Sequence, residues 1–150
     1  MIKRTISVAQ ICGMELSANT QLMCGTLLVT VPTIAYGGTF LLKVLSGKSP
    51  VPLTDFQKSM FRAGHAHAGV LVLLALIVQP LVDAVDYGTV TEWLVRSGFG
   101  AAAIFISGGF FASAGHKNAT SPNKWIALIW VGALVLTAVL ITLGLGLILN

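Results

Sequence analysis

Two histidines stand close together in a stretch of small side chains, residues 61–69, near the middle of the sequence. The residues next to His65 and His67 are glycines and alanines, which leave space beside each imidazole ring. The stretch leads into a long apolar run, residues 70–82. Histidines are costly to place within a bilayer, and those found there commonly serve a function. The residue types therefore predict a cofactor site, a proton path or a packing role between helices.

The spacing of His65 and His67 limits what the pair can bind. On a helix, two residues separated by one other residue point about 200° apart. A metal ion chelated by one helix needs ligands three or four residues apart, so this pair does not predict a chelate. The helical metal motifs His-Glu-x-x-His and Glu-x-x-His are absent from the sequence. One imidazole is nevertheless sufficient as an axial ligand of haem.

A haem site also needs room for a flat ring and cations near its propionates. Gly64, Ala68 and Gly69 are small enough to leave that room on the same stretch. Arg62 precedes the histidines at the expected end of the apolar run, where its planar guanidinium could pair with propionates or serve as an interfacial anchor. No Cys-x-x-Cys-His motif is present, so covalently attached haem is not supported.

Other candidates for the same site come from the third apolar segment. Phe105, Phe110 and Phe111 could form apolar walls beside a haem. His116 follows this segment and has three candidate roles: second ligand, partner of a propionate, or residue of an interfacial loop.

The composition places these residues in a membrane protein. Of 150 residues, 55% are hydrophobic and only 9% are charged. Soluble domains carry about 25% charged residues, so water cannot be the only solvent of this chain. There is no basic stripe with interleaved aromatic residues, which argues against nucleic acid as a partner.

Four apolar segments are long enough to cross a bilayer as helices, which requires about 20 residues each. They cover about residues 21–45, 56–82, 93–115 and 125–149. Because the connections are short, neighbouring helices are expected to be antiparallel. The sequence predicts one transmembrane domain over residues 1–150, an all-α four-helix bundle with an interfacial lead-in at residues 1–20.

The distribution of charge predicts an orientation. Basic residues gather on or near the first and third connections: Lys43, Lys48, Lys58, Arg62, Lys117 and Lys124. The opposite side carries Lys3, Arg4 and Arg96 together with four acidic residues. The positive-inside rule then places loops 46–54 and 116–124 in the cytoplasm and both termini outside. We expect the membrane to be a bacterial inner membrane.

The third segment is rich in small residues, with the pairs Gly108/Ala112 and Gly109/Ser113 at a spacing of four. Such pairs let helices approach closely in lipid. They predict tight packing within the bundle, a subunit interface or a cofactor wall. The fourth segment is rich in Leu, Val and Ile nearly all round, as expected for a helix with much lipid contact.

Three short motifs resemble a known family. Residues 62–69, Arg-Ala-Gly-His-Ala-His-Ala-Gly, resemble the Arg-Ala-His-x-Gly stretch of styrene oxide isomerases, which are small four-helix membrane proteins that bind haem b. Residues 22–28 resemble the first helix of that family, and Gly-Gly-Phe-Phe at 108–111 with Ser-Pro-Asn at 121–123 resembles the end of its third. The His-Ala-His pattern is also similar to a helix of haem–copper oxidase subunit I-like proteins.

The resemblance implies that His67, or alternatively His65, ligates haem b between the subunits of a homotrimer. The other haem face would stay open, and the iron would act as a Lewis acid that opens an epoxide toward a carbonyl product. The isomerases carry a tyrosine where this chain has Gly109, and an asparagine where it has only Val and Leu at 70–74. Tyr36 is the candidate catalytic substitute.

Three functions follow as hypotheses. The first is a haem b-binding membrane protein whose iron serves epoxide isomerisation of a small apolar substrate, or serves as a redox or ligand-binding centre. The second is a non-enzymatic accessory or assembly subunit of a larger membrane complex, with structural histidines. The third, a small transporter or channel, is weakened by the absence of acidic residues within the predicted spans and of an inverted repeat.

Overall fold

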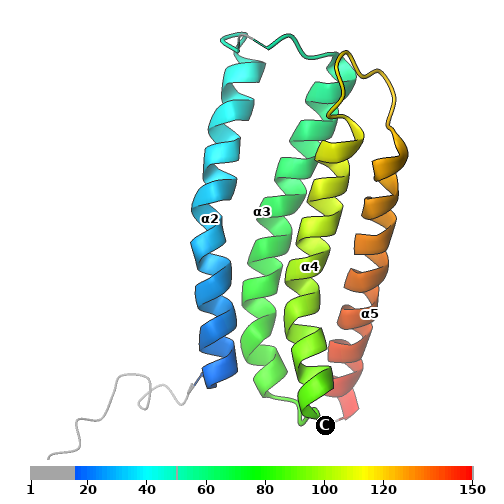
Figure 1. Cartoon of the computed structure of the whole chain (residues 1–150). Helices are drawn as coiled ribbons and strands as arrows, with labels where there is room; N and C mark the ends of the chain where they lie inside the picture. Colours follow the sequence, from blue (N-terminus) through cyan, green and yellow to red (C-terminus); the bar gives the residue numbers. More distant parts are fainter. Residues whose placement is uncertain (1–15, 50, 150) are drawn as a thin grey trace, which may run out of the picture.

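The computed structural model describes residues 16–49 and 51–149, and the regular secondary structure of these residues is entirely helical. The elements, in chain order, are α2 (Ala18–Leu45), α3 (Asp55–Asp83), α4 (Thr89–Ser113), the short 3-10 helix η1 (Lys124–Ile126) and α5 (Ala127–Leu149). The predicted all-α fold with four long helices is confirmed (Figure 1). Each long helix, with η1 counted as the start of the fourth, is long and apolar enough to cross a membrane.

Capping residues explain where two of the helices begin. Ser17 caps α2 by accepting a hydrogen bond from the Thr20 backbone N–H at 3.1 Å. Thr54 and Gln57 form a reciprocal capping box at the start of α3. Residues 18–20 therefore belong to α2, although the sequence placed them in the interfacial lead-in. Residues 1–15 of that lead-in lie outside the described part of the chain.

The third helix is shifted toward the N-terminus relative to its predicted span. It begins at Thr89, four residues before Trp93, and ends at Ser113, two residues before Gly115. Its first turn contains Glu92, whose negative charge is favourable at a helix N-terminus. The predicted span left out this polar first turn, which the structure includes in the helix at one end of the bundle.

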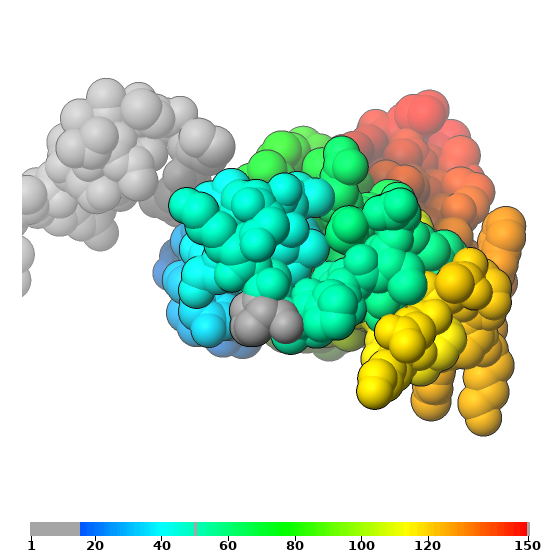
Figure 2. Space-filling model, turned by 90° about the horizontal axis from the view of Figure 1, so that it is seen from above, coloured from blue at the N-terminus to red at the C-terminus, as the bar shows by residue number. Residues whose placement is uncertain are grey.

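The four helices form an antiparallel row in chain order rather than a closed square. α4 packs extensively on α3 and on α5, while α2 packs mainly on α3. Among the described residues, α2 contacts α4 only slightly and does not contact α5. Seen along the helices, α2 stands at one flank and α5 at the other (Figure 2). The bundle is therefore open between α2 and α4.

Glycines bring α4 and α5 into close contact. A Cβ atom on Gly109 would lie 2.8 Å from the Ile129 backbone nitrogen, and one on Gly132 would lie 2.9 Å from that of Ile106. Gly108 has no such neighbour within 4 Å. Of the three roles predicted for the small residues of α4, tight packing within the bundle is thus the one that Gly109 serves.

The α3–α4 loop is fastened to the end of α5 by Tyr87. Its hydroxyl donates a hydrogen bond to the Thr142 carbonyl at 2.8 Å, and its ring lies over Gly146. Burial raises the pKa of Tyr87 above its ordinary value, so the hydroxyl keeps the proton that it donates. This contact adds to the glycine-mediated packing that holds α5 on the row.

Candidate functional site

His65 and His67 lie on one uninterrupted helix, α3, and contact different neighbours. The His65 ring lies against α2, where Cβ atoms on Gly37 and Gly38 would lie 3.7 and 3.2 Å from its nitrogen atoms. The His67 ring stacks on Phe110 of α4, with ring centroids 4.9 Å apart and an interplanar angle of 29°. The two imidazoles therefore point to different sides of α3, as their spacing predicts, and they do not form a chelate.

The His67 ring is held in one tautomer by its own helix. Its Nδ1 lies 2.7 Å from the Ala63 carbonyl oxygen. Because a carbonyl only accepts, the proton is assigned to Nδ1, and in the neutral ring Nε2 then holds the free lone pair. The side chain is exposed at the surface of the chain. Metal-ligating histidines are commonly oriented by this kind of hydrogen bond to a backbone carbonyl.

The His65 ring occupies a tighter place between α3 and α2. A Cβ atom on Gly38 would lie 3.2 Å from His65 Nε2, so the glycine admits the ring. No hydrogen bond to the His65 ring is formed by the described residues. The ring lines a cavity of about 250 Å³ together with Gly69 and apolar side chains of both helices. This volume is below the roughly 300–1,000 Å³ of pockets for drug-sized ligands, so the described chain leaves little room for a haem here.

The small residues predicted to make room for a cofactor lie in three different surroundings. Gly64 is buried, and a Cβ atom there would lie 3.0 Å from Phe110 Cβ and 3.1 Å from Phe111 Cε2. The space beside Gly64 is thus filled by α4 and is not open to a flat ligand. Gly69 lines the cavity of His65, and Ala68 lines a groove between α2 and α4.

Arg62 is exposed near the start of α3. From the helical period it points about 60° away from His65 and about 140° away from His67. It therefore shares a side of the helix with His65 more closely than with His67. Tyr36, the candidate catalytic residue, is 78% exposed on α2 and does not line the cavity beside His65.

His116 is an exposed residue of the loop after α4, which matches the loop role among its three predicted roles. Its backbone carbonyl accepts a hydrogen bond from Gln57 Nε2 at 3.0 Å. The imidazole borders a second cavity, of about 410 Å³, together with Phe40 and Phe61. Within the part of the chain that the structure describes, His116 does not contact His65 or His67.

The structure also contains a buried polar cluster that sequence reasoning missed. Arg96 of α4 is only 1% exposed. Its guanidinium donates to the Asp83 and Glu92 carboxylates, the latter at 2.8 Å, and to the Thr20 hydroxyl at 2.8 Å and the Gln79 carbonyl at 3.1 Å. From its place near the end of a predicted span, Arg96 was expected to be one of the charges that set the topology. The spacing of four between Glu92 and Arg96 is the sequence pattern that could have indicated the pair.

This cluster ties three helices together at one end of the row. Ser17, the cap of α2, donates its hydroxyl to Asp83 at 2.7 Å, and Asn19 donates its amide to Glu92 at 2.9 Å. The charged groups are therefore hydrogen-bonded as well as paired, which is the condition for a stable buried ion pair. We interpret the cluster as structural.

Within the described residues, the histidines stand as single imidazoles and belong to no cluster of three or more metal-ligating side chains. No group of three or more His, Cys, Asp or Glu side chains within residues 16–49 and 51–149 could hold a metal ion. Comparisons with family models, with curated proteins and with solved structures give no match to this chain. The geometry of His67 is accordingly the feature on which a functional proposal can be built.

Proposed function

We propose that this protein binds haem b in the membrane, with His67 as the axial ligand and His65 as the alternative. The observation that carries the proposal is the hydrogen bond from His67 Nδ1 to the Ala63 carbonyl oxygen, at 2.7 Å. It leaves Nε2 with a lone pair on an exposed ring. The Phe110 ring stacked against the imidazole further restricts its orientation. A single oriented imidazole is what one face of a haem requires.

The other walls of a haem pocket at His67 have to be supplied by a second protein chain. The His67 ring is exposed, and the space beside Gly64 is taken by Phe110 and Phe111. A second copy of the chain supplies the missing walls in this proposal, so the haem protein is a homo-oligomer. The trimer implied by the family resemblance is the specific form that we propose.

Haem held by His67 would supply an iron for Lewis-acid, redox or ligand-binding chemistry. For isomerisation of an epoxide, the resemblance implies a tyrosine as well as the haem. At Gly109, where the similar isomerases have a tyrosine, a Cβ atom would lie 2.7 Å from Ile129 Cγ1 of α5. That position points at a neighbouring helix, and Tyr36 is on the outer side of α2. A redox role, or the binding of a small molecule at the iron, needs only the imidazole of His67 from this chain. We therefore favour these roles over isomerisation.

The decisive experiment is an absorption spectrum of the purified full-length protein with the variants His67→Gly, His65→Gly and His116→Gly. We expect a Soret band in the wild type that is lost in His67→Gly and restored by added imidazole, because free imidazole can replace the missing ligand. His65→Gly and His116→Gly serve as matched controls and should keep their haem. Loss and imidazole rescue in His65→Gly alone would transfer the ligand role to His65.

A colourless wild type, expressed with haem in excess, would overturn the haem proposal. If that protein also co-purified with partners in fixed stoichiometry, the accessory-subunit function would replace it. The histidines would then have the packing roles visible at Gly38 and Phe110.

We also propose that the protein lies in a bacterial inner membrane with loops 46–54 and 116–124 in the cytoplasm. The support comes from Arg96, whose charge is buried against Asp83 and Glu92 and does not count as a free surface cation. Within residues 16–49 and 51–149, every other Lys and Arg lies toward the opposite end of the row, on or near those two loops. Single cysteines in place of Asn118 and Asp86, in a background without Cys12 and Cys24, test this orientation. An impermeant thiol reagent added to intact cells should label Asp86→Cys and not Asn118→Cys.

A further inference from the structure

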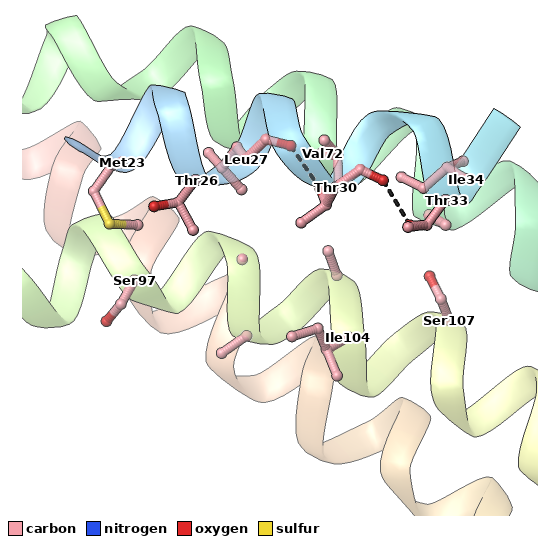
Figure 3. A pocket seen from close by; sticks show the side chains of 14 residues that line it. Met23, Thr26, Leu27, Thr30, Thr33, Ile34, Val72, Ser97, Ile104 and Ser107 are labelled. Atoms are coloured by element: carbon pink, nitrogen blue, oxygen red, sulfur yellow. Dashed lines mark hydrogen bonds between the residues drawn. The ribbon is translucent and has the colours of Figure 1, made fainter. Parts of the chain in front are cut away.

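A long groove separates α2 from α4. It has a volume of about 600 Å³ and runs from Met23 to Ile34 on α2 and from Ser97 to Ser107 on α4, with Val72 of α3 on its floor (Figure 3). It exists because α2 packs on α3 and scarcely contacts α4. None of the three histidines lines it.

Most hydroxyl groups along the groove are satisfied by their own helices. Thr26, Thr30 and Thr33 donate to carbonyl oxygens three or four residues earlier, at 2.9, 2.6 and 2.6 Å. Ser97 donates in the same way to Trp93 at 2.6 Å. These groups therefore present mainly methyl and methylene surface to the groove.

Ser107 is different. Its side-chain oxygen is the only buried side-chain nitrogen or oxygen in the described residues that lacks a hydrogen-bond partner, and the residue is 6% exposed. The hydroxyl points from α4 toward Thr33 across the groove (Figure 3). An unsatisfied buried hydroxyl costs free energy, which a ligand atom that accepts a hydrogen bond from it would recover.

We propose that this groove binds a neutral, apolar molecule that carries one carbonyl oxygen and accepts a hydrogen bond from Ser107. Its volume falls within the range of about 300–1,000 Å³ for small-molecule sites. No Lys, Arg, His, Asp or Glu lines the groove, so a carboxylate, phosphate or amine would be left without a counter-charge. Small residues such as Gly100 and Ala101 leave the space for the apolar body.

The ligand reaches the groove from within the bilayer. Ile104, on its α4 wall, is 71% exposed, so the groove opens sideways. Ser107 lies six residues before the end of α4 at Ser113, which is about 9 Å along the helix. The ester carbonyls of lipids stay near the interface, so an ordinary phospholipid would fill the groove with hydrocarbon and leave Ser107 unpaired. A ketone dissolved in the membrane could enter from the side and place its carbonyl oxygen at the depth of Ser107.

Benzophenone, with diphenylmethane as its carbonyl-free counterpart, tests the proposal on the full-length protein in nanodiscs. Benzophenone also cross-links to nearby C–H groups under light, so its site can be mapped by mass spectrometry. We expect saturable labelling of the α2 and α4 walls, with affinity about fivefold lower in Ser107→Ala because one hydrogen bond is lost. The infrared carbonyl band of bound benzophenone should shift upward in that variant. Diphenylmethane should compete equally well in both proteins.

Two glycine variants separate the groove from the general membrane surface. A Cβ atom on Gly100 would lie 3.8 Å from Leu27 Cδ2, so Gly100→Leu starts without a clash and then fills the groove. It should abolish saturable labelling, whereas Gly108→Leu, outside the groove, should not. Labelling spread over all lipid-facing helices, or unchanged by both Ser107→Ala and Gly100→Leu, would show bulk lipid partitioning and overturn the proposal. The outcome does not depend on haem, because none of the histidines lines the groove.

Discussion

The guanidinium of Arg96 on α4 donates a hydrogen bond to the carboxylate of Asp83 at the end of α3, and the arginine side chain is almost fully buried. The same guanidinium also pairs with Glu92 one turn earlier. Both carboxylates remain about one-fifth exposed, so the pair lies at the edge of the bundle and not at its centre. It joins the two helices that carry most of the core.

Removing this arginine should strongly destabilise the protein. Arg96→Ala leaves two carboxylates without their cation and removes one of the two side-chain donors to the Gln79 carbonyl, at a cost of about 3 kcal/mol. The midpoint of thermal unfolding in detergent should fall accordingly. Arg62→Ala, which removes an exposed arginine near the other end of the row, is the matched control and should unfold like the wild type. Equal midpoints for the two variants would contradict a structural role for the cluster.

Two neighbouring glycines should respond in opposite ways to the same substitution. In Gly109→Ala, the new Cβ would lie 2.7–2.8 Å from atoms of Ile129, including its backbone nitrogen, so α4 and α5 must move apart. Overpacking of this kind costs about 1–3 kcal/mol. Gly108→Ala meets nothing within 4 Å and gains helix propensity, so its stability should be equal or slightly higher. The thermal unfolding midpoints of both variants test this prediction. A Gly109→Ala protein as stable as the wild type would contradict the close contact between α4 and α5.

The number and type of the helices could be predicted from the sequence because apolar length is a strong signal in lipid. The opposite directions of His65 and His67 also followed from the helical period alone. The sequence could not show that α2 stands apart from α4, because an apolar helix surface looks the same whether it meets lipid or protein. For the same reason it did not reveal which glycine, Gly108 or Gly109, contacts α5.

The polar cluster was missed for a related reason. Glu92 and Arg96 stand at the expected edge of a span, where charged residues usually face water and signal topology. Only the approach of Thr20 and Gln79 from two other helices shows that Arg96 is buried. The space around Gly64 was misjudged because a small residue indicates that something approaches closely, not whether it is a cofactor or, as here, Phe110 and Phe111.

If His67 is the haem ligand, then its partner Phe110 should matter more to the haem than the glycine beside His65. Phe110→Leu removes the ring that stacks on the His67 imidazole, so the Soret band should shift or its intensity should fall. Gly38→Ala places a Cβ 3.2 Å from His65 Nε2 and displaces that ring, but it should leave the band unchanged. Spectra normalised to protein concentration measure both effects. A shift in Gly38→Ala with none in Phe110→Leu would favour His65.

Gln57 should control the loop that carries His116. Its side-chain amide donates to the Ala114 and His116 carbonyls, both at 3.0 Å, while its side-chain oxygen accepts from the Thr54 backbone N–H. Gln57→Glu keeps the acceptor of the capping box but replaces the donating nitrogen by a carboxylate oxygen, which faces the Ala114 and His116 carbonyl oxygens without a proton to share. The free energy of unfolding should fall by about 1–3 kcal/mol, because the Gln57 side chain is buried.

Hydrogen exchange followed by mass spectrometry localises this effect. Amides of residues 114–119 should exchange faster in Gln57→Glu, while those in the middle of α4 should not change. Gln21→Glu is the matched control, since the Gln21 amide donates to a single carbonyl, that of Leu16, at an exposed position. If both variants leave exchange at 114–119 as in the wild type, Gln57 does not hold the loop. If only Gln57→Glu loosens it, the amide is the link between the start of α3 and the end of α4.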